Sequence, residues 1–333
     1  MKNKTRFAVV GCGTISEAHL KSIEHVPEAE LVAVCDIKPT LAEEKGKLYG
    51  VNAYSSLEEL LKQDNIDVVN ICTPSSLHPE QTKLAAKAGK HVFVEKPMAI
   101  QIKDVEDMIQ VCKENHVHLA TVFPRRMSPQ ANYARELIQS GKLGKLSLCS
   151  AYMKIYRSQE YYDSAGWRGT WEYDGGGAMM NQGIHTIDLL QWLAGPVSSL
   201  YGKSRTLLRD IEVEDTAASL LEFEHGAIGV MEMTTTAHIN ETVRIEILGE
   251  NGTLIYINDE ITTLKMNGQD IELPEFESFS VFPDGHRIQI QDMAQAVREG
   301  RKPMITGEDG KHSLDLILGT YESSRENKEL HFN

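Results

Sequence analysis

Residues 6–36 have the sequence RFAVVGCGTISEAHLKSIEHVPEAELVAVCD, in which two apolar runs enclose a glycine turn and a helical pattern. Residues 6–10 are mostly apolar and β-branched, which predicts a strand. Residues 15–26 carry apolar side chains at helical spacing, and residues 30–36 form a second apolar run. A strand, a glycine turn, a helix and another strand in this order predict a βαβ unit.

The alternation of strands and helices continues to about residue 122. The expected strands are apolar almost throughout, which is typical of a parallel sheet covered by helices on both faces. From residue 197 to about 282, short strand patterns follow one another. We therefore expect an α/β fold in which a doubly wound parallel sheet forms a domain over residues 1–122. An α+β domain with a large, mostly antiparallel sheet follows over residues 123–333.

The chain is acidic, with 48 Asp and Glu against 34 Lys and Arg and a net charge of −14. Such a chain repels phosphate backbones and anionic lipids, which argues against nucleic acid or membrane partners. No apolar run approaches the ~20 residues of a spanning helix, and the apolar run after the basic N-terminus is too short for a signal peptide. The five cysteines are odd in number and lack a Cys-x-x-Cys pair, which favours reduced thiols in a cytoplasmic protein.

The glycine turn has the features of a dinucleotide site. Such a site needs a first glycine for the tight turn, here Gly11, and a second for close approach of the pyrophosphate, here Gly13. It also needs a small residue for helix packing, here Ser16. Asp36 ends the second strand, where a carboxylate can bind ribose hydroxyls and repel a 2′-phosphate. This favours NAD, although nearby Lys38 keeps NADP open as an alternative. The competing interpretation is a plain strand-to-helix turn with a solvated aspartate.

Polar residues also follow two later strands of the expected sheet. Thr73, Pro74 and His78 follow the fourth strand, and Lys96 follows the next one. Ligands bind at the carboxyl ends of parallel strands in such folds. Lys96 would give a fixed positive charge or a donor to a reacting oxygen. The alternatives are an ordinary Pro-Ser loop and a lysine that extends to solvent.

A second polar group lies on the helix expected over residues 179–194. Asn181, His185 and Asp188 are spaced i, i+4 and i+7, which predicts one shared face. His185 is the side chain best suited to exchange a proton near neutral pH. The alternative is a structural histidine on a helix flank. Zinc is disfavoured because asparagine is a poor ligand and no thiol is nearby, so we predict no metal.

The motifs together resemble the Gfo/Idh/MocA family of NAD(P)-dependent sugar and polyol dehydrogenases. The glycine turn is generic, whereas the combination of Glu-Lys-Pro with the later Gly-Gly-Gly and His-x-x-Asp segment is specific. The resemblance covers the whole chain, and the segments that carry it, besides Asp36, are GCGTIS (11–16), ICTPSSLHPE (71–80), VEKP (94–97), GWRGTW (166–171), GGGAMMNQGIHTIDLLQWLAG (175–195) and TGEDGKHSLDLILGTYESS (306–324).

The resemblance implies a Rossmann domain, hydride transfer from a secondary alcohol to NAD(P), and a role for each matching residue. It identifies His185 as the group that accepts the hydroxyl proton and Lys96 as the group that stabilises the alkoxide. The implied cofactor-binding residues are Gly11, Gly13, Thr14, Ile15, Asp36, Thr73, Pro74, His78, Glu95, Lys96, Arg126, Trp167 and Arg168. The implied substrate-binding residues are Lys96, Tyr156, Asn181, His185 and Asp188.

Asn181 departs from the family pattern, in which many members carry Asp four residues before the histidine. Asparagine cannot hold the charge of an Asp–His pair, so we expect it to bind a substrate hydroxyl instead. In having asparagine at this position, the chain resembles the nucleotide-sugar 3-dehydrogenases of the family, which act on UDP-N-acetylhexosamine derivatives. The finer functional prediction is therefore an enzyme of that kind.

Two other functions compete with a sugar, nucleotide sugar or cyclitol dehydrogenase. One is a nicotinamide-binding sensor without turnover, and the other is hydride transfer to an imine or conjugated double bond. Residues 226–233 are apolar or small on both strand faces. Together with the resemblance they predict a homodimer or homotetramer through the C-terminal sheet, and a strand buried within one chain is the alternative.

Overall fold

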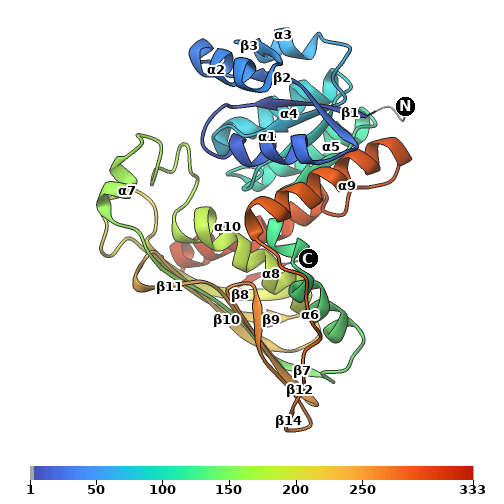
Figure 1. Cartoon of the computed structure of the whole chain (residues 1–333). Helices are drawn as coiled ribbons and strands as arrows, with labels where there is room; N and C mark the ends of the chain where they lie inside the picture. The colour runs from blue at the N-terminus through green and yellow to red at the C-terminus, as the bar shows by residue number, and fades with distance from the viewer. Residues whose placement is uncertain (1–3, 333) are drawn as a thin grey trace. The chain divides into compact units, whose positions relative to one another are not determined.

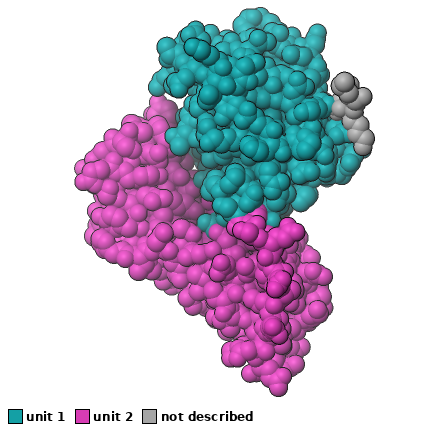
Figure 2. Space-filling model, in the orientation of Figure 1, with its two compact units in different colours: residues 1–127, 280–311 teal, residues 128–279, 312–333 magenta. Residues whose placement is uncertain are grey.

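The computed structural model describes residues 4–332. The chain forms two compact units, which Figure 2 colours separately. Unit 1 contains the residues up to 127 together with residues 280–311. Unit 2 contains residues 128–279 together with the residues from 312 onward.

Unit 1 is built on a six-stranded sheet with the order β3-β2-β1-β4-β5-β6. Every neighbouring pair in it is parallel, and β4 is buried along its whole length. This is the buried parallel sheet that the apolar strands predict. The strands are β1 (Thr5–Val10), β2 (Ala29–Cys35), β3 (Asn52–Tyr54), β4 (Val68–Ile71), β5 (His91–Val94) and β6 (Leu119–Thr121).

The helices of unit 1 begin and end at residues whose backbone preferences suit those positions. Pro39 opens α2, and Gly50 ends it in the left-handed conformation with φ +67°. The Ser56 hydroxyl caps α3 by accepting from the Glu59 amide. The helices are α1 (Ser16–His25), α2 (Pro39–Tyr49), α3 (Leu57–Leu61), α4 (His78–Lys87), α5 (Ile102–Glu114) and α9 (His286–Glu299), with short turns η1 (Ser75–Leu77), η2 (Pro124–Met127) and η4 (Val281–Gly285).

Helix α9 belongs to unit 1 although it follows the long sheet of unit 2 in the chain (Figure 1). Ile290, Met293 and Ala294 are fully buried and join the same apolar core as Phe7. Thr5 Oγ1 also donates to the Ala294 carbonyl over 2.9 Å. The compact units therefore differ from the predicted domains 1–122 and 123–333, because the apolar face of α9 completes the core beside β1.

Unit 2 contains a nine-stranded sheet with the order β14-β13-β12-β11-β7-β10-β9-β8-β15. Among the described strand pairs of this second sheet, only β7 and β10 run parallel, so the predicted mostly antiparallel sheet is confirmed. The strands are β7 (Leu146–Tyr156), β8 (Val197–Arg205), β9 (Thr216–Phe223), β10 (Ile228–Thr234), β11 (Thr236–Gly249), β12 (Gly252–Ile257), β13 (Glu260–Met266), β14 (Gln269–Asp270) and β15 (Leu330–His331).

The helix predicted over residues 179–194 is divided in two. Its first part, η3 (Ala178–Gly183), is a wider π turn, and α8 (Ile184–Ala194) follows it. Such turns change the side-chain register relative to a regular helix. The remaining helices are α6 (Pro129–Gln139), α7 (Gln159–Asp163) and α10 (Gly307–Glu326), which begins in unit 1 and continues in unit 2.

Strand β10 has one buried and one accessible face, and Glu232, which pairs with Lys154, interrupts the apolar residues predicted on the accessible face. Met231 and Met233 are buried, whereas Ile228 on the other face is 53% exposed and Val230 is half-buried. Helix α8 packs on the neighbouring strands β7 and β11. Among residues 4–332, no helix has both the length and the apolar character needed to cross a membrane. All five cysteines are buried and unpaired.

A buried carboxylate holds the chain just before η3. Glu214 accepts hydrogen bonds from the amides of Gly177 and Met179, each over 2.8 Å, and from the Tyr321 hydroxyl over 2.8 Å. A Cβ on Gly177 would lie 1.8 Å from the Glu214 carbonyl oxygen, so only glycine fits there. Burial raises the pKa of Glu214 to about 7.

The raised pKa of Glu214 predicts a pH-dependent stability. The folded chain binds this proton more tightly than the unfolded chain, so its contribution is fully present below about pH 4.5 and is lost as the pH rises through about 7. Between these values the unfolding free energy of the wild type should fall relative to that of Glu214→Gln, by at most ~3 kcal/mol.

Urea unfolding followed by circular dichroism at pH 4.5, 6 and 7.5 measures this difference. The exposed Glu222→Gln variant is the control and should follow the wild type. Parallel pH profiles for the wild type and Glu214→Gln would contradict the assignment.

Candidate active site

The glycine turn after β1 is tightly packed at Gly11 and open at Gly13. Gly11 has φ +90°, and a Cβ there would lie 2.8 Å from backbone atoms of Cys72, so the turn passes tightly over the end of β4. Gly13 is exposed, and a Cβ there would meet no atom within 4 Å. The Ser16 hydroxyl donates to the Gly13 carbonyl over 2.6 Å. The turn thus offers open backbone before α1, which suits a pyrophosphate.

Asp36 at the end of β2 is fixed against this turn. One carboxylate oxygen accepts from the Cys12 amide and the other from the Lys38 amide, each over 2.8 Å. Each oxygen keeps a second lone pair that can accept from a ribose hydroxyl. Asp36 is half-buried, while Thr14 is exposed and Ile15 is half-buried. Asp36 and the open turn therefore fit the ribose and the pyrophosphate of a dinucleotide.

His78 connects the loops that follow β4 and β5. Its ring nitrogens lie 2.8 Å from the Thr73 carbonyl and 2.9 Å from the Pro97 carbonyl. The Thr73 hydroxyl donates to Gln81 over 2.6 Å. Burial lowers the pKa of His78. His78 therefore positions both loops, and the exposed Pro74 and half-buried Lys96 lie on the loops that it joins.

Glu95 lies at the centre of a buried cluster under this edge of the sheet. Its Oε1 is 2.8 Å from His19 Nε2 and 3.4 Å from His286 Nε2, and its Oε2 accepts from the Lys96 amide over 3.1 Å. The amide nitrogen of Asn70 lies 3.0 Å from His19 Nδ1, so His19 donates from Nε2. The cluster thus holds the backbone at Lys96.

The charges of this cluster follow from its contacts. Burial lowers the pKa of His19, which favours the neutral ring. Burial alone would raise the pKa of Glu95, but the hydrogen bonds from His19 and His286 lower it well below its usual value. The ligand atoms of these three residues lie within 4.8 Å of one another, as a metal site requires, but they are already joined by hydrogen bonds. We interpret the cluster as a hydrogen-bonded support for the sheet edge.

The structure adds two buried histidines, His19 and His286, that were not predicted from the sequence. One signal was available, because His19 lies four residues from both Ile15 and Ile23 and so falls on the apolar face of its helix. A polar residue at a core position needs a buried partner. The partner itself was not visible, since Glu95 is 76 residues away from His19 in the sequence.

Arg126 is 5% exposed and forms an ion pair with Asp309 over 2.8 Å. Burial alone would raise the pKa of Asp309, but Arg126 beside it lowers that pKa. The ion pair thereby joins η2, which carries Arg126, to the first turn of α10, which carries Asp309, and both residues belong to unit 1.

In unit 2, the segment with Asn181 and His185 is held by a second carboxylate. Asp174 is buried and accepts from the Gly169 amide over 2.7 Å and from the Asn181 side-chain nitrogen over 3.2 Å. Asn181 and His185 are half-buried. Asp188 is 1% exposed and accepts from Ser313, so its carboxylate lies inside the unit, although the sequence predicts it on an accessible face.

Tyr156, Trp167 and Arg168 lie near the short helix α7. Tyr156 is 43% exposed and stacks on His238, with ring centroids 4.4 Å apart. The Arg168 guanidinium lies 4.6 Å from the Trp167 ring centroid. Arg168 also donates to the Tyr161 hydroxyl over 2.6 Å, a contact that the sequence does not predict.

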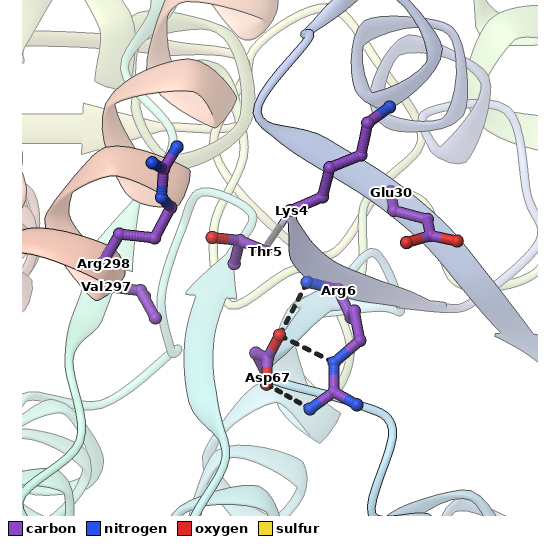
Figure 3. A pocket seen from close by; sticks show the side chains of 7 residues that line it. All are labelled: Lys4, Thr5, Arg6, Glu30, Asp67, Val297 and Arg298. Atoms are coloured by element: carbon purple, nitrogen blue, oxygen red, sulfur yellow. Dashed lines mark hydrogen bonds and ion pairs between the residues drawn. The ribbon is translucent and has the colours of Figure 1, made fainter. Parts of the chain in front are cut away.

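A hollow of about 440 Å³ lies at the opposite, amino-terminal edge of the parallel sheet (Figure 3). Arg6 and Asp67 form an ion pair across it over 2.7 Å. Ligands in such folds bind at the carboxyl ends of the strands, so this hollow is not the nucleotide site. Its lining residues are Lys4, Thr5, Arg6, Glu30, Asp67, Val297 and Arg298.

Two family models match the chain. The model described as an oxidoreductase family with an NAD-binding Rossmann fold matches residues 5–123. The model of the GFO/IDH/MocA C-terminal domain matches residues 131–255. The two matched segments contain the glycine turn and His185, respectively.

Solved structures and curated proteins give the same assignment. The chain is 36% identical to the WlbA dehydrogenase from Bordetella pertussis in complex with NADH and UDP-GlcNAcA, with a TM-score of 0.90 and 99% of both chains covered. It is 34% identical to the WlbA structure from Chromobacterium violaceum with the same ligands, with a TM-score of 0.91 and 100% and 97% coverage. It is 28% identical to myo-inositol 2-dehydrogenase of Thermotoga maritima, with 98% of both chains covered. The chain therefore belongs to the Gfo/Idh/MocA family of NAD-binding oxidoreductases, as its motifs predict.

Proposed function

We propose that this protein is a dehydrogenase that oxidises a secondary alcohol of a sugar, nucleotide sugar or cyclitol with NAD, and catalyses the reverse reduction. The observation that carries this proposal is Asp36, whose carboxylate is fixed against the open glycine turn at the Cys12 amide. The family membership and the dehydrogenases among its relatives support it.

Asp36 supports NAD over NADP because its carboxylate would repel a 2′-phosphate. Lys38 is exposed two residues later and keeps NADP as the alternative cofactor. Gly13 and Thr14 would meet the pyrophosphate at the open side of the turn. The bound nicotinamide supplies the acceptor for the hydride.

Two side chains would handle the proton and the charge of the alcohol. His185 at the start of α8 would accept the hydroxyl proton, since imidazole exchanges protons near neutral pH. Lys96 would stabilise the negative charge that develops on the oxygen. Glu95 supports this role because it fixes the backbone at Lys96.

Asn181 supports a more specific function. Its side-chain nitrogen donates to Asp174 over 3.2 Å, which fixes the amide, and the carbonyl oxygen of that amide is a group that would accept from a substrate hydroxyl. The similarity to two WlbA structures with bound UDP-GlcNAcA favours a UDP-N-acetylhexosamine-type 3-dehydrogenase as the finer assignment.

We also propose a homodimer or homotetramer that forms through the sheet of unit 2. Leu220 and Ile228 are 56% and 53% exposed on adjacent strands, which supports contact with a second copy. A cytoplasmic location is the matching proposal, supported by the five unpaired thiols.

Replacing Asp36 by Ala should weaken the binding of NADH and reduce the difference in affinity between NADH and NADPH. The variant loses both the acceptor for the ribose hydroxyls and the charge that repels the 2′-phosphate. Fluorescence titration with the two reduced cofactors measures this. Glu30→Ala is the control, since Glu30 lies on the same strand at the opposite sheet edge. An unchanged cofactor preference in Asp36→Ala would assign Asp36 to a surface role.

Lys96→Ala and His185→Ala should each lower turnover by roughly a hundredfold or more while NADH still binds. The assay follows nicotinamide absorbance with a panel of sugars, inositols and UDP-sugars. The exposed Lys87→Ala and His25→Ala variants should keep wild-type rates. Full turnover in either active-site variant would refute its role, and NADH binding without turnover on any substrate would favour a sensor.

A further inference from the structure

We propose that Arg157, Arg168 and Tyr161 form a binding site for an anionic group, a carboxylate or a phosphate, on the substrate. The proposal rests on the proposed dehydrogenase function and narrows its substrate to sugars that carry negative charge. All three residues belong to unit 2.

Aromatic rings hold both guanidinium groups at the same place. Arg157 follows directly after β7, Tyr161 is on α7, and Arg168 is in the loop after that helix. The Arg157 and Arg168 Cζ atoms lie 4.9 and 4.4 Å from the Tyr161 ring centroid. Arg168 is also 4.6 Å from the ring of Trp167. Figure 1 shows α7 at one end of the sheet and β14 at the other. Stacked guanidinium groups are pre-oriented, so they lose little freedom when an anion binds.

Neither guanidinium is neutralised inside the protein. In the described chain, no carboxylate forms an ion pair with Arg157 or Arg168, and the Nε atom of each is buried without a hydrogen-bond partner. An unsatisfied buried donor is unfavourable, and in a chain of net charge −14 it is unexpected for a cation. Both residues are half-buried, so their outer Nη groups can meet a ligand. By contrast, carboxylates form ion pairs with several other arginines, among them Arg6, Arg126, Arg244, Arg287, Arg301 and Arg325.

Tyr161 adds a donor to the two guanidinium groups. Its oxygen accepts from Arg168 Nη1 over 2.6 Å and from Gln182 Nε2 over 3.3 Å. Because both lone pairs are then used, the hydroxyl proton is available to a further acceptor, such as an anion on a ligand. Gln182 is three residues before His185, so one residue that contacts Tyr161 is close in the sequence to the proposed proton acceptor.

The surroundings strengthen the positive charge. Arg209 donates from Nε to the Arg157 carbonyl over 2.7 Å and lies 5.1 Å from the Tyr156 ring centroid. The acidic residues of α7, Glu160 and Asp163, are exposed, and Asp163 already accepts from Gln159. Guanidinium forks match the oxygen pairs of carboxylates and phosphates equally, so the source of the anion is decided by experiment.

The test is isothermal titration of the NADH-loaded full-length protein with four probes. UDP-GlcNAcA carries carboxylate and phosphate, glucuronate only carboxylate, UDP-GlcNAc only phosphate, and myo-inositol no charge. The wild type should bind UDP-GlcNAcA at least tenfold tighter than myo-inositol. At saturating NADH, Arg157→Gln should weaken the binding of UDP-GlcNAcA by roughly ten- to hundredfold and leave that of myo-inositol unchanged. Because the resemblance also assigns Arg168 to cofactor binding, Arg168→Gln should weaken UDP-GlcNAcA roughly ten- to hundredfold more than myo-inositol.

The single-charge probes identify the anion. If the glutamine variants lose affinity for glucuronate alone, the site binds the carboxylate. If they lose affinity for UDP-GlcNAc alone, the site binds the phosphate. Arg168→Lys keeps the positive charge but not the paired N–H donors of the guanidinium, so it should keep part of the affinity for UDP-GlcNAcA. Arg325→Gln, an exposed control on α10, should bind every probe like the wild type. Unchanged UDP-GlcNAcA affinity in both glutamine variants, or equal weakening of all four probes, would overturn the proposal.

The binding readout separates this proposal from the proposed function. If neutral substrates are oxidised and neither glutamine variant changes binding of any anion, the dehydrogenase function stands and the anion site is rejected. If anion binding depends on Arg157 and Arg168 but no substrate is turned over, the anion site stands and the dehydrogenase function is rejected. Unchanged thermal unfolding midpoints confirm that the variants fold.

Discussion

Unit 1 depends on one buried ion, the carboxylate of Glu95. It receives His19 from α1, His286 from the start of α9, and the amide of Lys96 at the end of β5. A buried carboxylate is stable only when its oxygens are satisfied, so these donors must stay in place. The helix that follows the glycine turn, helix α9 and the proposed catalytic lysine are thereby fixed to one point.

Unit 2 uses buried carboxylates in the same way. Glu214 holds the amides of Gly177 and Met179, and Asp174 holds the side chain of Asn181. These contacts fix the π turn from which α8 and His185 continue. His185, the proposed proton acceptor, thus follows a segment whose backbone is held by hydrogen bonds, which would lower the entropic cost of ordering it when a substrate binds.

Electrostatics in this protein act on two scales. The net charge of −14 repels anions at a distance, yet the groups that would meet NAD and the substrate are backbone amides, Lys96 and unpaired arginines. Short-range hydrogen bonds in half-buried sites outweigh the screened field of the whole chain. The proposed anion site is therefore compatible with an acidic chain, because Arg157 and Arg168 lie together without a carboxylate partner among residues 4–332.

The sequence by itself determined the local elements, because hydrogen bonding within helices and side-chain periodicity act over a few residues. It placed the first two strands within one residue of their observed bounds, and it placed Gly11 and Asp36 at the carboxyl ends of those strands. It did not predict the partner of His19, the burial of Asp188, the π turn or the unit to which α9 belongs. Those features depend on residues brought together from as far as 191 positions apart, as His286 and Glu95 are, and only the packed tertiary structure decides such pairs.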